Sequence, residues 1–109
     1  MRLFGRRRAK SAEGSLDRAA DSADTAHLKE FAESRQGVEA YVEPATTMTS
    51  TTVVLVAHDG EWTRRRVRDP KAAEELARKL EIPVYDAQVV GYPDRMRAWN
   101  HRKRDESSS

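Results

Sequence analysis

The sequence predicts an α+β domain with a three- or four-stranded, mostly antiparallel sheet, helices on one face and the element order α-β-β-β-α-β-α. Separate stretches of the chain point to this class. Residues 51–68, TTVVLVAHDGEWTRRRVR, hold Asp-Gly between two strand-like runs, which is typical of a β-hairpin. Residues 37–43 alternate between apolar and polar side chains, as a half-exposed strand does. Residues 70–81 carry an apolar stripe at helical spacing.

Length and composition indicate how the chain is organised. Its 109 residues suggest one domain, expected at residues 25–100, between a basic, disordered leader (residues 1–24) and a polar tail (residues 101–109). The net charge is +2, and the absence of cysteine excludes disulfides and thiolate chemistry. No apolar run approaches the ~20 residues that span a bilayer. No signal-peptide pattern follows Met1, so a cytoplasmic location is expected.

The first helix is expected from about residue 25 to residue 35. Apolar side chains recur on one face of this segment at helical spacing: Leu28, Phe31 and Ala32. Gly37 suits the helix exit, and the strand that follows is closed by Pro44. A threonine-rich linker, residues 44–50, then leads into the central strand.

The hairpin is interpreted with Asp59-Gly60 as a two-residue type I′ turn. This turn pairs Ala57 with Trp62, so the two faces of the hairpin follow from the alternation of side chains. One face then carries Val53, Leu55, Ala57, Trp62, Arg64 and Arg66. The other carries Val54, Val56, Thr63, Arg65 and Val67. Which face is buried stays open.

The second half of the chain alternates helices with an extended segment. Asp69 is a good N-cap and Pro70 suits the first helical position, so a helix is expected over residues 70–81. Pro83 stops it, and residues 84–90 are predicted to be extended. Residues 91–93 turn the chain into a short helix. An apolar cluster is expected to seal this segment: Tyr85, Tyr92, Met96 and Trp99.

The arginines of the hairpin are the main candidate site. Arg64, Arg66 and Arg68 follow one another at the spacing of a strand, beside Trp62. Guanidinium groups next to an indole suit phosphates with a stacked base, although a solvated edge strand explains the same pattern. The leader adds a second basic cluster, which includes Arg6, Arg7 and Arg8. This cluster is interpreted as an attraction for nucleic acid, an acidic protein or an anionic membrane surface.

Other chemistry finds little support in the sequence. His27, His58 and His101 have no metal-ligand spacing, so no metal is expected. No phosphate-binding loop, dinucleotide fingerprint or nucleophile elbow is present, and no cofactor is expected. These observations lean away from an enzyme. A small enzyme or ligand carrier, with a pocket between sheet and helices, is kept as an alternative.

The chain resembles a group of small uncharacterised actinobacterial proteins, from about Leu28 to Trp99. The resemblance rests on the segments RQGVEAYVEP, TTVVLVAHDGEWTRRRV and IPVYDAQVVGYPDRMRAW. It implies no established activity, although some members bear an unspecific oxidoreductase label. Residues 25–81 are also similar in element order to the double-stranded-RNA-binding domain, which holds phosphates with a basic cluster opening its second helix. Only Lys71 matches that cluster here.

Taken together, these features favour a non-enzymatic accessory module that binds a macromolecule through basic surfaces. Trp62, Arg64, Arg66 and Arg68 are expected to form the docking face, with the leader adding non-specific attraction. Nucleic acid or a ribonucleoprotein is slightly favoured over an acidic protein as the partner. The alternative is an adaptor that the polybasic leader recruits to a membrane surface.

Overall fold

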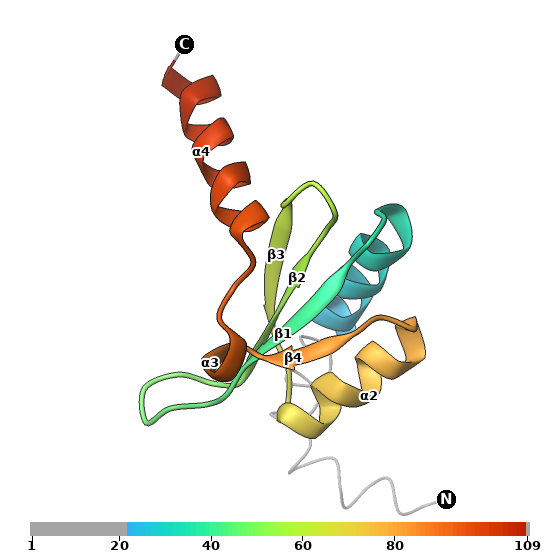
Figure 1. Cartoon of the computed structure of the whole chain (residues 1–109). Coiled ribbons are helices and arrows are strands. Elements are labelled where there is room, and N and C mark those ends of the chain that lie inside the picture. Colours follow the sequence, from blue (N-terminus) through green and yellow to red (C-terminus); the bar gives the residue numbers. More distant parts are fainter. Residues whose placement is uncertain (1–21, 109) are drawn as a thin grey trace, which may run out of the picture.

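The computed structural model describes residues 22–108 and has the predicted α+β fold, built on a four-stranded sheet in the order β3-β2-β1-β4 (Figure 1). The strands are β1 (Glu39–Glu43), β2 (Thr52–Val56), β3 (Trp62–Arg66) and β4 (Val84–Asp86). β1, β2 and β3 form an antiparallel meander, whereas β4 pairs with β1 in parallel. The sheet is therefore mixed and mostly antiparallel, as the sequence predicts.

The helices begin and end where local signals require. An N-terminal helix covers residues 22–34, followed after the meander by α2 (Pro70–Leu80). The Asp69 carboxylate accepts a hydrogen bond from the Ala72 amide at 2.8 Å, which confirms the predicted N-cap. Glu81 then takes a left-handed conformation with φ of 58°, which ends α2 ahead of the strand.

The C-terminal region is more helical than the sequence suggests. The prediction of an extended segment over residues 84–90 is wrong beyond residue 86, because the Asp86 carboxylate caps α3 (Ala87–Val90) by accepting from the Gln88 amide at 2.8 Å. α4 (Asp94–Ser108) is not short and continues through the segment expected to be a polar tail. Side-chain pairs along the helix support it, including Lys103 with Glu106 at 3.2 Å. Within residues 22–108, no helix has the length and apolar content needed to cross a membrane.

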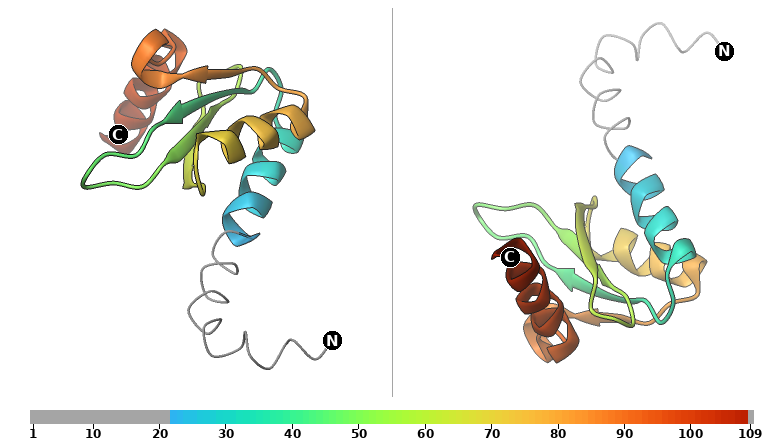
Figure 2. Two further views of the ribbon diagram at one scale, coloured as in Figure 1. Left: turned by 90° about the horizontal axis from the view of Figure 1, so that it is seen from below. Right: turned by 90° about the horizontal axis from the view of Figure 1, so that it is seen from above.

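One face of the sheet packs against the N-terminal helix and α2 through an aliphatic core (Figure 2). Leu28 and Phe31 reach the sheet from the N-terminal helix, and α2 contributes the small residues Ala73 and Ala77, which let it lie close to the sheet. The sheet side of this core is made of Val42, Val53, Leu55 and Ala57. These contacts exclude water, and their burial supplies the main favourable term in folding.

The C-terminal segment covers part of the opposite face. A second core lies here, in which Met96 from α4 and Ala87 from α3 pack on the sheet. The sheet residues are Tyr41, Val54 and Val56, and Tyr92 and Trp62 are partly buried at the margin. The N-terminal helix and α2 are therefore the helices on one face that the sequence predicts, while the end of the chain forms a second, smaller layer on the other face (Figure 2). Met96 and Tyr92, two members of the predicted apolar cluster, belong to this second core.

The hairpin forms as predicted, but its predicted register was wrong by one residue. Trp62 pairs with Val56 and Arg64 with Val54, because the loop has three residues and not two. The Ala57 amide donates to the Glu61 carbonyl at 2.8 Å, and Gly60 has φ of 96°, the arrangement of a turn closed by a glycine bulge. A one-residue shift exchanges the faces of the second strand. Trp62 and Arg64 consequently share a face with Val54 and Val56, and not with Leu55.

Candidate functional site: a basic groove beside the hairpin

Trp62 and Arg64 lie together on the sheet face that carries α4, and both are engaged within the domain. The Trp62 indole donates its Nε1–H to Asn100 Oδ1 at 2.8 Å. The Arg64 guanidinium lies 5.3 Å from the indole ring centroid and donates to both carboxylate oxygens of Glu43, at 2.8 and 3.0 Å. The polar groups that would meet a phosphate or a base here already have partners.

Glu43 is the centre of this polar network. Its carboxylate also accepts hydrogen bonds from the hydroxyl groups of Thr52 and Tyr92. Burial favours the neutral acid, but the hydrogen bonds from Arg64, Thr52 and Tyr92 outweigh it and lower the pKa of Glu43 to about 2. Glu43 thus stays charged at neutral pH and ties β1, β2, β3 and the segment before α4 together.

Arg66 and Arg68 lie elsewhere, in a groove between the end of the hairpin, the N-terminal helix and α2. The groove has a volume of about 180 Å³. Its lining consists of Thr25, Arg66, Val67, Arg68, Ala72, Glu75, Leu76 and Lys79, and is called the basic groove below. Val67 and Leu76 belong to the margin of the aliphatic core, so the floor of the groove is apolar.

The charges of the basic groove are unbalanced. Among the described residues, its lining includes the cations Arg66, Arg68 and Lys79, but only one carboxylate, Glu75. Within residues 22–108, no acceptor binds any of these cations. Neighbouring arginines of the same strand differ: Arg64 binds Glu43, and Arg65 lies 3.5 Å from Asp24. The exposed cationic groups at this end of the hairpin are therefore available to an anion.

The structure divides the four predicted hairpin residues into two pairs. Trp62 and Arg64 lie beside α4 and Glu43, while Arg66 and Arg68 are among the residues that line the basic groove at the end of the hairpin. Sequence reasoning missed Lys79, which lines the groove from α2 and lies more than ten positions after Arg68 in the chain. Its place in the last turn of a helix, on the flank of the apolar stripe, was the available signal.

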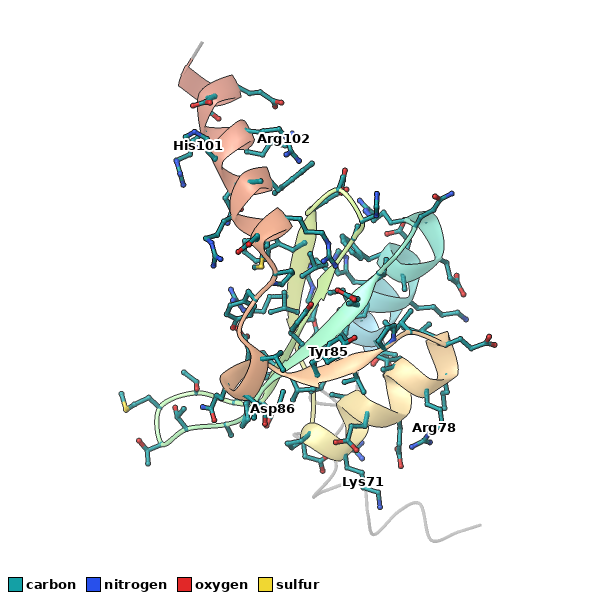
Figure 3. The ribbon with its side chains drawn as sticks, viewed as in Figure 1. Lys71, Arg78, Tyr85, Asp86, His101 and Arg102 are labelled. Atoms are coloured by element: carbon teal, nitrogen blue, oxygen red, sulfur yellow. The ribbon has the colours of Figure 1, made fainter. Side chains whose placement is uncertain are left out.

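Further predicted positions fall outside this groove. Arg6, Arg7 and Arg8 lie outside the described residues. Lys71 and Arg78 project from α2, at the end of the molecule away from His101 and Arg102 of α4 (Figure 3). Among residues 22–108, no three histidines, cysteines or carboxylates gather in a way that would hold a metal ion. His27 instead hydrogen-bonds the Thr63 hydroxyl at 2.7 Å.

Comparison of the chain with protein-family models, with curated proteins and with solved structures finds no match.

Proposed function

We propose that this protein is a non-enzymatic binding module that holds the phosphate backbone of a nucleic acid in the basic groove. The observation that carries the proposal is the set of cations Arg66, Arg68 and Lys79 on an apolar floor, without an acceptor among residues 22–108. Phosphate contacts from arginine and lysine supply most of the affinity in sequence-independent binding. Trp62 and Arg64 are left out of the contact, because Asn100 and Glu43 already occupy them.

The groove suits a flexible strand better than the interior of a duplex groove. Its volume of about 180 Å³ admits a phosphate and part of a sugar, but none of the described helices or strands projects from it to enter a DNA major groove. Arg66 is the last residue of β3 and Arg68 follows just beyond the strand, and both line the groove. We therefore expect weak, salt-sensitive binding of single strands with little preference for sequence.

The proposal is tested with fluorescence polarisation of a labelled 20-nucleotide single strand at a series of salt concentrations. We expect the double variant Arg66→Glu/Arg68→Glu to lose at least tenfold in affinity, since two cations become anions. The slope of log K against log salt should also fall by about 0.7 for every phosphate that the variant no longer binds.

The matched control is Lys29→Glu/Arg97→Glu, which makes the same change of charge at exposed positions outside the groove. It should bind much more tightly than the groove variant. Equal loss in both variants would mean that only the net charge matters, and unchanged binding by the folded groove variant would reject the site. A parallel titration with polyglutamate tests the acidic-protein alternative, which predicts binding at least as tight as that of the nucleic acid.

A further inference from the structure

A second hollow lies on the other face of the sheet, between the edge strand β4 and the segment that joins α3 to α4. It is lined by Glu39, Tyr41, Tyr85, Val90, Gly91, Tyr92 and Pro93, and has a volume of about 190 Å³. This tyrosine hollow shares no residue with the basic groove. Figure 3 shows Tyr85 on β4, close to the start of α3 that Asp86 marks.

The three tyrosine rings are held by the sheet register and by hydrogen bonds. Tyr41 and Tyr85 are direct partners on the parallel strands β1 and β4, so their side chains lie on the same face, with ring centroids 5.4 Å apart. The Tyr92 ring lies 6.2 Å from the Tyr41 ring, tilted by 51°. Tyr41 is 5% exposed and forms the floor, while Tyr85 is 38% exposed at the edge.

The hydroxyl groups of the two inner rings are already used. Tyr41 donates to Glu39 at 2.9 Å, and Tyr92 donates to Glu43. The hydroxyls of Tyr41 and Tyr92 are therefore not available to a ligand, which leaves their rings as the contact surface. The face of an aromatic ring carries negative electrostatic potential, and it attracts a cation whose centre lies within about 6 Å of the ring centroid.

The described lining of the tyrosine hollow carries a negative charge and no positive one, which favours a cation. Of the described residues that line the hollow, Glu39 is the only carboxylate, and none is an arginine, lysine or histidine. Arg95 neutralises Glu39 in part, at 2.6 Å, but lies outside the lining. Val90, which lines the hollow, is 55% exposed and offers apolar contact to alkyl groups.

We infer that the tyrosine hollow is a binding site for an alkylammonium head group, held by the rings of Tyr41, Tyr85 and Tyr92. A methylated ammonium fits this chemistry best, because its methyl groups lower the cost of removing the charge from water and contact the rings and Val90. The volume suits one such head group, since pockets for nucleotide- or drug-sized ligands begin at about 300 Å³. The source is either a free quaternary amine or a methylated lysine of a protein.

The test is an NMR titration of the full chain with tetramethylammonium chloride, following the aromatic resonances of the tyrosines. We expect saturable shifts at Tyr85 and Tyr92. Choline should bind and its neutral isostere 3,3-dimethylbutanol should not, because the isostere has the same shape without the charge. Equal binding of the isostere, or no saturable shift with any cation, would overturn the inference.

Substitutions of Tyr85 test whether the cation binds in the tyrosine hollow. Tyr85→Leu removes one ring and should weaken binding at least fivefold, whereas Tyr85→Phe keeps the ring and should bind like the wild type. Val89→Ala lies outside the lining and should leave binding unchanged. Binding retained by folded Tyr85→Leu, or lost equally in Tyr85→Phe, would exclude the proposed ring contacts.

The two sources are distinguished by a second pair of ligands. Acetyl-trimethyllysine methylamide binding more tightly than choline would assign the site to a protein partner, and the reverse order would assign it to a free amine. Both orders support the alkylammonium site. The nucleic-acid titration uses other residues, so failure of either proposal leaves the other unaffected.

Discussion

The two faces of the sheet are covered in different ways. The face under the N-terminal helix and α2 is closed by aliphatic side chains, with Leu28, Val53 and Leu55 almost fully buried. The face under α3 and α4 combines a smaller apolar cluster with charged networks centred on Glu39 and Glu43. Aliphatic packing needs no particular partner, whereas each partly buried carboxylate needs its own donors in place. We infer that the first face supplies most of the stability and the second fixes the position of the C-terminal segment.

The largest effect is expected from Leu55→Ala, on the aliphatic face. Leu55 is 1% exposed, in the middle of the central strand, so truncation leaves a cavity that rigid neighbours cannot fill. Such changes cost about 2–5 kcal/mol, a large part of the roughly 5–15 kcal/mol that stabilises a small domain. Urea denaturation followed by circular dichroism measures it. A loss below about 1 kcal/mol would mean that this face is not the main core.

The next largest effect is expected from Gly60→Ala, at the junction of the hairpin with α4. A Cβ at Gly60 would lie 2.0 Å from the Arg95 carbonyl oxygen, so the hairpin and α4 would have to separate. Gly91→Ala is the matched control: Gly91 also has positive φ, but a Cβ there would have no described atom within 4 Å beyond its chain neighbours. Both variants carry about 1–3 kcal/mol of backbone strain. Only Gly60→Ala should also expose Trp62 and Trp99, which lie at this junction, and the tryptophan emission should shift to the red.

Glu43→Gln tests the charged network of the second face. It keeps the shape of the side chain but removes the charge that Arg64, Thr52 and Tyr92 bind, and should cost about 1–3 kcal/mol. The comparison variant is Glu61→Gln: among residues 22–108 the Glu61 carboxylate binds Arg35 but no hydroxyl side chain, and the change should cost less than about 1 kcal/mol. Equal costs would mean that the hydroxyl donors at Glu43 have no energetic consequence.

The same carboxylate predicts how stability depends on pH. The pKa of Glu43 is lowered from 4.5 to about 2, so on acidification the unfolded state takes up the proton first. The stabilisation is complete above about pH 5 and is lost as the pH falls towards 2. Urea midpoints between pH 7 and pH 2 measure it. Glu43→Gln should flatten the profile, and an unchanged slope would assign the acid sensitivity to other groups.

Local signals in the sequence were enough for most of the elements, but not for their register or for the sites. Asp69 and Pro70 predict the start of α2 because a cap acts within a few residues. Asp59-Gly60 predicts a hairpin, but it suits two loop lengths, and the turn in the structure lies against Arg95, far along the chain. The partner of Trp62, Asn100, lies 38 positions away in a segment whose polar pattern does not predict a long helix. The pairing of Arg64 with Glu43 and the contribution of Lys79 to the groove likewise depend on contacts between segments far apart in the sequence.

The smallest effect is expected from Asp24→Asn, which removes the partner of Arg65 on the aliphatic side. Arg65 is the neighbour of Arg64 in the same strand and is about equally exposed, but its ion pair with Asp24 is 3.5 Å long, whereas Arg64 makes two hydrogen bonds of 2.8 and 3.0 Å to Glu43. Exposed ion pairs of this kind contribute about 0–1 kcal/mol, so Asp24→Asn should change the urea midpoint very little. Adjacent arginines then differ because of the face on which each lies. A cost equal to that of Glu43→Gln would show that charge pairs matter equally on both faces, and the contrast between the faces would fail.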